Sequence, residues 1–109
     1  MAIATRTLAI TQGNIDNSHI YLTEALDIFP QDVFGGPNES HVAPRLVRVT
    51  WGDESVETDI VKHIFRRRGW VSRFFSANQI KAGDQILLEQ LDPYQYRVSK
   101  VLSGTGSTE

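Results

Sequence analysis

The chain has 109 residues, enough for one compact domain with one hydrophobic core and too few for two. Hydrophobic residues make up 40% and charged residues 22%, a balance that excludes long disorder, collagen-like repeats and coiled coils. Cysteine is absent, which excludes disulfides, thiolate zinc sites and cysteine nucleophiles. No apolar run has the roughly 20 residues of a membrane helix and the first residues lack a signal-peptide pattern, so we expect an intracellular, cytoplasmic protein without membrane contact.

The net charge of −2 conceals a segregation by sign. Residues 60–83 contain six bases and no acid, whereas the rest of the chain contains five bases and all 13 acids. One positive patch on an otherwise acidic body would steer polyanions to one place, and phosphate is the natural suspect. A run of bases can also be an ordinary solvated face, so charge alone leaves both interpretations open.

Short apolar runs and polar turns alternate along the N-terminal half. Thr5–Thr11 has the alternating, β-branched pattern of a first strand, and Gln12–Ser18 has the composition of a polar turn or loop. Residues 19–22 are expected to form a second short strand. Thr23 then fits the N-cap of a helix of one to two turns that ends before Pro30.

The C-terminal half continues the β pattern. Arg45–Trp51 and Ser55–Val61 alternate in polarity and are predicted to form a hairpin. Ser72–Gln79 is predicted to be a short helix that anchors two phenylalanines on the core. Gln85–Glu89 and Tyr96–Leu102 are the last predicted strands.

These elements predict one domain over residues 1–102, followed by a flexible tail or linker over residues 103–109. Six or seven short strands with two short helices between them indicate a mainly β fold, a closed or nearly closed mixed barrel. Both tryptophans, Trp51 and Trp70, are expected to be core anchors because each ends or follows an apolar strand pattern.

The densest run of bases lies in residues 62–70, with the sequence KHIFRRRGW. On an extended segment Arg66 and Arg68 point one way and Arg67 the other, so the three cannot share one solvated face of a sheet. Guanidinium groups bind both guanine edges and phosphate in bidentate fashion, so one side of this segment could read bases while the other holds the DNA backbone. The alternative is an exposed hairpin end that arginine keeps in solution.

A second polar cluster offers amide, hydroxyl and imidazole groups within eight residues: Gln12, Asn14, Asn17, Ser18 and His19. Asparagine and glutamine can pair with adenine N6 and N7, and serine can serve either a base or a phosphate. An ordinary polar turn has the same composition. The cluster therefore gains weight only if the fold places it beside the basic segment.

Catalytic and metal sites are not indicated. No lysine stands two residues after any glutamate, as a carboxylate–lysine nuclease would require. His19, His41 and His63 lack metal-ligand spacing, and the neighbours Ser18 and His19 do not make a triad. We expect no enzyme activity, no metal and no cofactor in this chain.

The order of motifs in residues 62–89 resembles the second half of B3 DNA-binding domains. That family has a basic arm, a Gly-Trp pair, a short helix with aromatic residues, and a Gly-Asp pair before a hydrophobic strand. The corresponding residues here are Arg66–Arg68, Gly69-Trp70, Phe74-Phe75, Gly83-Asp84 and Ile86–Leu88. The resemblance covers residues 6–102 and is looser in the N-terminal half, where residues 19–30 stand in place of the family's second strand and first helix.

The resemblance implies a seven-stranded open pseudobarrel with two short helices, which grips the major groove of duplex DNA between two arms. By analogy, residues 11–19 are the N-arm and residues 62–70 the C-arm. The C-arm is shorter than in plant members and the first loop lacks their pattern, so the chain looks more similar to the bacterial branch. Those members are the recognition or effector domains of restriction endonucleases.

We therefore expect sequence-specific binding of double-stranded DNA by a domain that is monomeric in isolation, with any nuclease domain covalently linked or associated. The expected contacts are Arg66, Arg67 and Arg68 on bases and phosphate, Lys62, His63 and Arg73 on phosphate, and Gln12, Asn14, Asn17, Ser18 and His19 on the opposing arm, with Thr11 and Lys81 marginal. The alternative is a protein-interaction or small-ligand-binding β-barrel whose basic patch meets an acidic partner. Single-stranded or RNA binding is disfavoured because aromatic residues are not interleaved with the bases.

Overall fold

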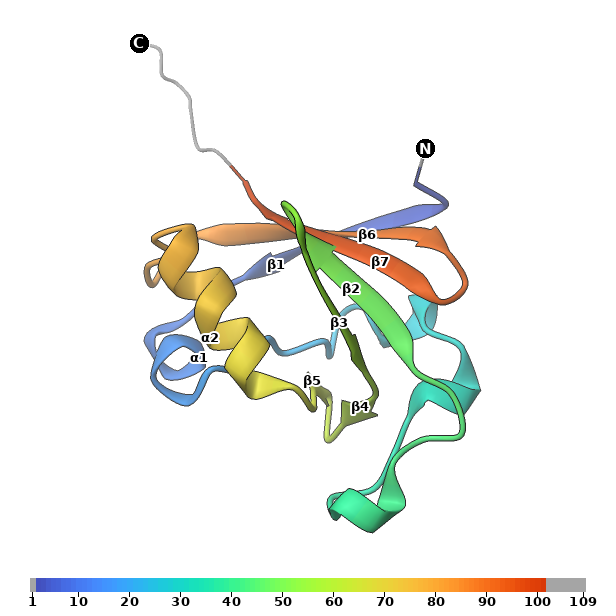
Figure 1. Cartoon of the computed structure of the whole chain (residues 1–109). Helices are drawn as coiled ribbons and strands as arrows, with labels where there is room; N and C mark the ends of the chain where they lie inside the picture. Colours follow the sequence, from blue (N-terminus) through green and yellow to red (C-terminus); the bar gives the residue numbers. More distant parts are fainter. Residues whose placement is uncertain (1, 102–109) are drawn as a thin grey trace, which may run out of the picture.

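The computed structural model describes residues 2–101, apart from the side chain of Glu39. This part of the chain forms two layers: a five-stranded sheet lies above, and two helices and a small hairpin lie below it (Figure 1). The strands are β1 (Ala4–Ala9), β2 (Val47–Trp51), β3 (Glu54–Thr58), β4 (Ile60–Val61), β5 (Ile64–Phe65), β6 (Gln85–Asp92) and β7 (Gln95–Lys100). The helices are α1 (Gln12–Asn17) and α2 (Arg68–Ala77), with 3₁₀ turns η1 (Leu26–Ile28), η2 (Gln31–Val33) and η3 (Glu39–His41).

The five-stranded sheet has the order β1-β6-β7-β2-β3. Its neighbouring strands are antiparallel, except that β2 and β7 run parallel with Val49 opposite Tyr96. Strands β1 and β3 are its edges, so the sheet is not closed into a barrel. The predicted class, mainly β with two helices and seven strands in an open pseudobarrel, is confirmed.

The hairpin β4–β5 forms a second, smaller sheet that is flanked on both edges. On the β5 edge Tyr21 pairs with Ile64, and on the β4 edge Phe34 pairs with Ile60. The segment that follows α1 and the segment that precedes residue 35 therefore lie on opposite sides of the same two strands. This arrangement positions the candidate site described below.

The hydrophobic core fills the space between the layers. Helix α2 buries Trp70, Val71, Phe74 and Phe75 on one face, at the spacing expected for an amphipathic helix. Trp70 is only 2% exposed, which confirms its prediction as a core anchor. Trp51 is half-buried and packs against the ring of Phe74, at 5.9 Å between centroids.

The predicted turn over Gln12–Ser18 was wrong, because residues 12–17 form α1. A reciprocal cap stabilises its start: the Thr11 hydroxyl accepts from the Asn14 amide at 3.2 Å, and the Asn14 side chain accepts from the Thr11 amide at 2.8 Å. Ser18 ends the helix in the left-handed conformation, at φ 55°. The capping asparagine stands where glutamate or glutamine is the usual signal, so the polar composition masked a helix.

Other boundaries also differ from those predicted. Residues 19–22 form only the single bridge at Tyr21, and the helix predicted from Thr23 is replaced by the 3₁₀ turn η1. Helix α2 begins at Arg68, four residues earlier than predicted, and Asp59 divides the predicted strand Ser55–Val61 into β3 and β4. The predicted tail over 103–109 lies outside the described residues.

Candidate nucleic-acid interface

The fold brings the N-arm and the C-arm together at the end of the molecule that holds the β4–β5 turn (Figure 1). The Leu22 amide donates to the carbonyl of His63 at 2.7 Å, next to the bridge between Tyr21 and Ile64. Arg68 is close enough to His19 to influence its ionisation. The two stretches, 40 residues or more apart in sequence, therefore lie on the same side of the molecule.

The tip of the C-arm is the two-residue turn Lys62-His63, and both side chains are exposed. Both residues have positive φ, 50° and 68°, as in the type I′ hairpin turn that normally uses Asn-Gly. A left-handed conformation costs a residue with a Cβ about 1–2 kcal/mol. The backbone of this turn would be better served by Asn-Gly, so its conformation does not explain why Lys and His occur here. Strain of this kind is typical of functional sites.

Helix α1 exposes some of the predicted N-arm residues and buries one. Gln12 and Asn17 are exposed, and their side chains bond within the helix, to the Asp16 carboxylate and to a backbone carbonyl, both at 2.9 Å. Asn14 is only 3% exposed because its side chain caps the helix. The prediction that Asn14 contacts a ligand is corrected: it is a structural residue.

His19 follows α1 and faces the C-arm. Its ring meets that of Tyr21 edge to face, at 5.5 Å between centroids, and Nδ1 lies 3.4 Å from the Tyr21 hydroxyl. Burial lowers the pKa of His19, and the positive charge of Arg68 lowers it further. At neutral pH the imidazole is uncharged, so it can both donate and accept a hydrogen bond.

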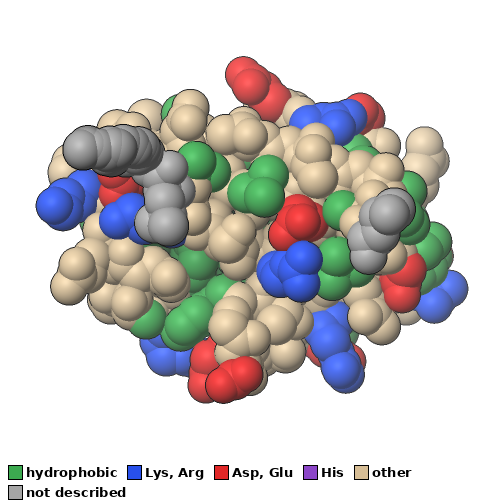
Figure 2. All heavy atoms as spheres, turned by 90° about the horizontal axis from the view of Figure 1, so that it is seen from above, with side chains coloured by type: hydrophobic (Ala, Val, Ile, Leu, Met, Phe, Trp, Pro, Cys, Tyr) green, Lys and Arg blue, Asp and Glu red, His purple; other side chains and the backbone are tan. Residues whose placement is uncertain are grey.

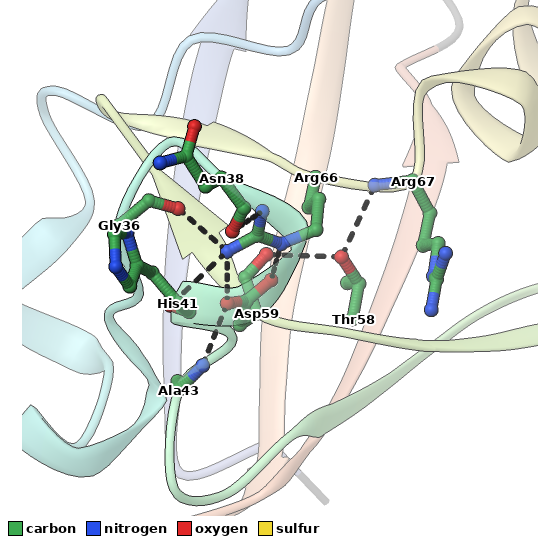
Figure 3. A network of polar contacts seen from close by, with 8 residues as sticks. All are labelled: Gly36, Asn38, His41, Ala43, Thr58, Asp59, Arg66 and Arg67. Carbon is green, nitrogen blue, oxygen red and sulfur yellow. Dashed lines mark hydrogen bonds and ion pairs between the residues drawn. The ribbon is translucent and has the colours of Figure 1, made fainter.

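Arg66 does not point to solvent, in contrast to its predicted role on DNA (Figure 3). Its Nε donates to Asp59 Oδ1 at 2.6 Å and its Nη2 to Asp59 Oδ2 at 2.8 Å, a bidentate ion pair. The side chains are only 9% and 1% exposed, respectively. Burial alone would raise the pKa of Asp59, but hydrogen bonds from Arg66 and the Ala43 amide outweigh it and the pKa is lowered.

The same guanidinium fixes the loop over residues 35–43. It donates to the backbone carbonyl of Gly36 at 2.7 Å and to that of Asn38 at 3.2 Å. The Ala43 amide, at the far end of the loop, donates to Asp59 at 2.9 Å. A Cβ at Gly35 would collide with the Asp59 carboxylate and come within 2.8 Å of Arg66 Nη2, so this approach requires glycine.

The two following arginines are exposed and point elsewhere. Arg67 extends away from Arg66, and its amide donates to the Thr58 hydroxyl at 3.2 Å (Figure 3). Arg68 opens α2 and lines a cleft of about 240 Å³ together with Arg66, Ile64, Val61 and Pro37. The predicted alternation of three extended arginines was wrong, because the extended segment ends before Arg68.

Two predicted bases lie apart from the arm tips. Arg73 of α2 lines a separate, open surface hollow of about 500 Å³, together with Trp51, Glu54, Ser72, Ser76 and Ala77. It is therefore not placed with the C-arm turn. Lys81 lies in the α2–β6 turn, where the Gly83 amide donates to Ile10 at 2.9 Å, close to the start of the N-arm.

Ion pairing separates the bases into two groups. Outside residues 60–83 every base is engaged: Arg6 with Asp27 (2.6 Å), Arg48 with Glu57 (3.3 Å), Arg97 with Glu89 (2.9 Å), Lys100 with Asp84 (3.7 Å), and Arg45 over the Tyr94 ring (3.7 Å). Figure 2 looks onto the sheet and shows acids and bases intermingled on that face. Inside residues 60–83 only Arg66 has an acid partner among the described side chains, and the exposed bases without one are Lys62, Arg67, Arg68, Arg73 and Lys81.

Sequence reasoning missed two features that border the arms. Tyr21 is 51% exposed, forms the bridge to Ile64 and contacts His19. The loop over residues 36–41 joins the site through hydrogen bonds from Arg66 to its backbone. A lone tyrosine in a short apolar run gives no local signal of exposure, and the loop's placement depends on partners about 20 to 30 residues away.

Comparisons of the chain with models of protein families, with curated proteins and with solved structures find no match. No three histidine, aspartate or glutamate side chains among the described residues gather as metal ligands would. None of the helices within residues 2–101 has the length and apolar character needed to cross a membrane. The assignment of function therefore rests on the geometry of the site.

Proposed function

We propose that the chain is a sequence-specific, double-stranded-DNA-binding domain that enters the major groove with the N-arm (residues 11–19) and the C-arm (residues 62–70). The observation that supports this most directly is the contrast in ion pairing. Bases outside residues 60–83 are neutralised by neighbouring acids or stacked, whereas Lys62, Arg67 and Arg68 of the C-arm are exposed without an acid partner. Exposed, unpaired bases at one end of an acidic protein suit a polyanion.

The geometry also suggests how the contacts divide. Arg68, in the cleft beside His19, is suited to a guanine edge, while Lys62, His63 and Arg67 are suited to phosphate. The N-arm side chains that remain available for DNA contacts opposite the C-arm are Gln12, Asn17, Ser18 and His19. Arg66 and Asn14 support the two arms from within, and Arg73 lies outside the interface.

As such a domain, the chain would recognise DNA on behalf of a nuclease domain, linked or associated, of the restriction-endonuclease type. Binding would then be its whole chemistry, with no metal, cofactor or catalytic residue of its own. The strained turn at Lys62-His63 supports a binding role, because positive-φ residues with side chains are retained where a surrounding function needs them.

Selection of bound sites from a randomised duplex library tests the proposal, followed by fluorescence anisotropy on the selected site. With about three or four phosphates neutralised, log affinity should fall against log salt with a slope of roughly −3. Excess single-stranded DNA should compete poorly. Enrichment of no sequence, or binding that ignores salt, would overturn the proposal.

The second candidate is a domain that binds a small ligand or an acidic protein partner. The surface hollow of about 500 Å³ beside Trp51 favours it, because an indole and the unpaired base Arg73 line the same space. Tryptophan fluorescence distinguishes the candidates. A ligand in this hollow should perturb Trp51 and be lost with Arg73→Ala, whereas DNA at the arms should bind that variant normally.

A further inference from the structure

The loop over residues 36–41 borders the end of the molecule that holds the two arms, but it belongs to neither the N-arm nor the C-arm. Phe34 pairs with β4, on the edge of the hairpin opposite to the one that Tyr21 occupies. Pro37 then lines the same cleft as Arg68. In Figure 1 the loop with η3 projects beyond the hairpin on one side, and α1 lies on the other. The β4–β5 hairpin therefore lies between this loop and the segment that contains α1.

The loop differs chemically from the C-arm. Residues 35–44 include no lysine or arginine and one acid, Glu39, whereas residues 62–70 include four bases. Asn38, Ser40 and His41 are exposed, and neither the Asn38 nor the Ser40 side chain makes a hydrogen bond within the described part of the chain. An amide or a hydroxyl adds little to the salt-dependent part of the affinity, whereas an asparagine amide can pair in two places with the edge of adenine.

Hydrogen bonds hold the backbone of the loop in place, whereas the Asn38 side chain is exposed. Arg66 binds the carbonyls of Gly36 and Asn38, and the Gly36 amide donates to His41 at 2.7 Å to close the loop. Figure 3 shows the Asn38 side chain directed away from the guanidinium that holds its carbonyl. A side chain presented on a fixed backbone loses little conformational freedom on binding.

We propose that residues 36–41 are a third DNA-contacting segment, in which the Asn38 amide reads a base edge and Arg66 acts as a positioning residue. This inference rests on the proposed function. It changes the picture of the interface from two arms to three segments, of which only the C-arm is basic. The loop contributes base preference, and the C-arm contributes most of the salt-dependent affinity.

Asn38→Ala tests the inference on the selected duplex, because the substitution removes an exposed amide and should leave the fold intact. Affinity should fall about 5- to 100-fold, the preference should relax at one base position, and the salt slope should stay at its wild-type value. Gln95→Ala is the matched control, since it removes an exposed amide from β7 in the five-stranded sheet. That variant should bind as the wild type does.

Arg66→Lys tests the positioning role, because lysine keeps the charge but cannot bind several carbonyls at once. Its preference should relax at the same base position as that of Asn38→Ala, with an unchanged salt slope. If this variant fails to fold, Asn38→Ala decides the question alone.

The possible outcomes separate the two proposals. A wild-type chain that binds no duplex overturns both. A wild-type chain that binds, with Asn38→Ala equal to it in affinity and base preference, overturns only the role of the loop. A loss of affinity in Asn38→Ala that is equal for all duplex sequences would mean phosphate contact, and it too overturns base reading by this residue.

Discussion

Arginines on the five-stranded sheet and arginines at the arm end differ in whether an acid lies beside them. On the sheet, Arg97 pairs with Glu89 across the β6–β7 ladder, whereas at the arm end Arg68 is exposed without an acid partner. Surface bases beside acids contribute little field at a distance, and unpaired ones contribute much more. The number of bases is therefore a poor guide to a polyanion site, and the position of the acids is a better one.

Backbone conformation separates the same two regions. Non-glycine residues with positive φ occur at Ser18, Lys62, His63 and Gln79 within the described chain. Three of the four belong to the arms, and the five-stranded sheet itself contains none. The sheet is locally relaxed and its bases are paired with acids, while both arms contain positive-φ residues and the C-arm carries unpaired bases. This is the division expected between scaffold and binding site.

The largest expected effect would show that Arg66 belongs with the scaffold. Arg66→Ala leaves the Asp59 carboxylate buried without its partner, so the free energy of unfolding should fall by about 3–5 kcal/mol in urea titrations at neutral pH. The lowered pKa means that the Asp59 contribution is present above its ordinary value of 3.8 and is lost as pH falls through the lowered pKa. The gap between variant and wild type should therefore narrow in acid; a loss below 1 kcal/mol at neutral pH would contradict this assignment.

The next effect concerns binding and not stability. Arg68→Ala should weaken binding to the selected duplex by about 1–3 kcal/mol in anisotropy titrations if it reads a base, with unfolding changed by less than about 0.5 kcal/mol. The control is Arg97→Ala, an exposed arginine of the sheet whose ion pair is worth about 0–1 kcal/mol and whose loss should leave DNA affinity unchanged. Equal effects of the two variants on DNA would remove the distinction between the regions.

The strained turn offers a test with opposite signs. Replacing Lys62-His63 by Asn-Gly supplies residues that accept positive φ, so the protein should gain about 1–2 kcal/mol of stability in urea unfolding. The same change removes two side chains assigned to phosphate, so DNA affinity should fall and the salt slope should become shallower by about one. A double variant that is more stable and binds DNA undiminished would show that the turn has no role in binding.

The smallest effect is that of pH on His19. Its pKa is below the ordinary value of 6.5 in the folded protein, so its contribution to stability is present above that value and is lost as pH falls. Phosphates nearby should favour the protonated ring, so DNA affinity should rise between pH 7.5 and 5.5. The difference between the wild type and His19→Gln isolates the effect of His19; identical pH profiles would place His19 away from the DNA.

The sequence allowed the sheet to be predicted better than the lower layer. Alternation in Arg45–Trp51 and a short hydrophobic run in residues 85–89 predicted strands, and both segments contribute buried side chains to the five-stranded sheet. Residues 12–17 were missed as a helix because their helix is short, contains glycine and relies on a cap between Thr11 and Asn14. Local polarity cannot distinguish such a segment from a turn.

The candidate site was predicted in outline and not in its internal roles. Arg66, Arg67 and Arg68 are adjacent and chemically identical, yet one is buried, one extends from the chain and one opens a helix. What separates them is Asp59 and the carbonyls near residues 36–41, which the fold brings to Arg66 alone. No property of the arginine run by itself contains that information.

The contact between Gly35, Asp59 and Arg66 has a consequence for evolution. A methyl group at Gly35 would displace the carboxylate, and loss of either charge would strand the other, so none of the three can change alone without cost. Homologous chains should keep the trio together or replace it as a set, most simply by a loop of different length. Tracing that linked replacement would mark the point at which descendants of this fold acquired a different loop beside the hairpin.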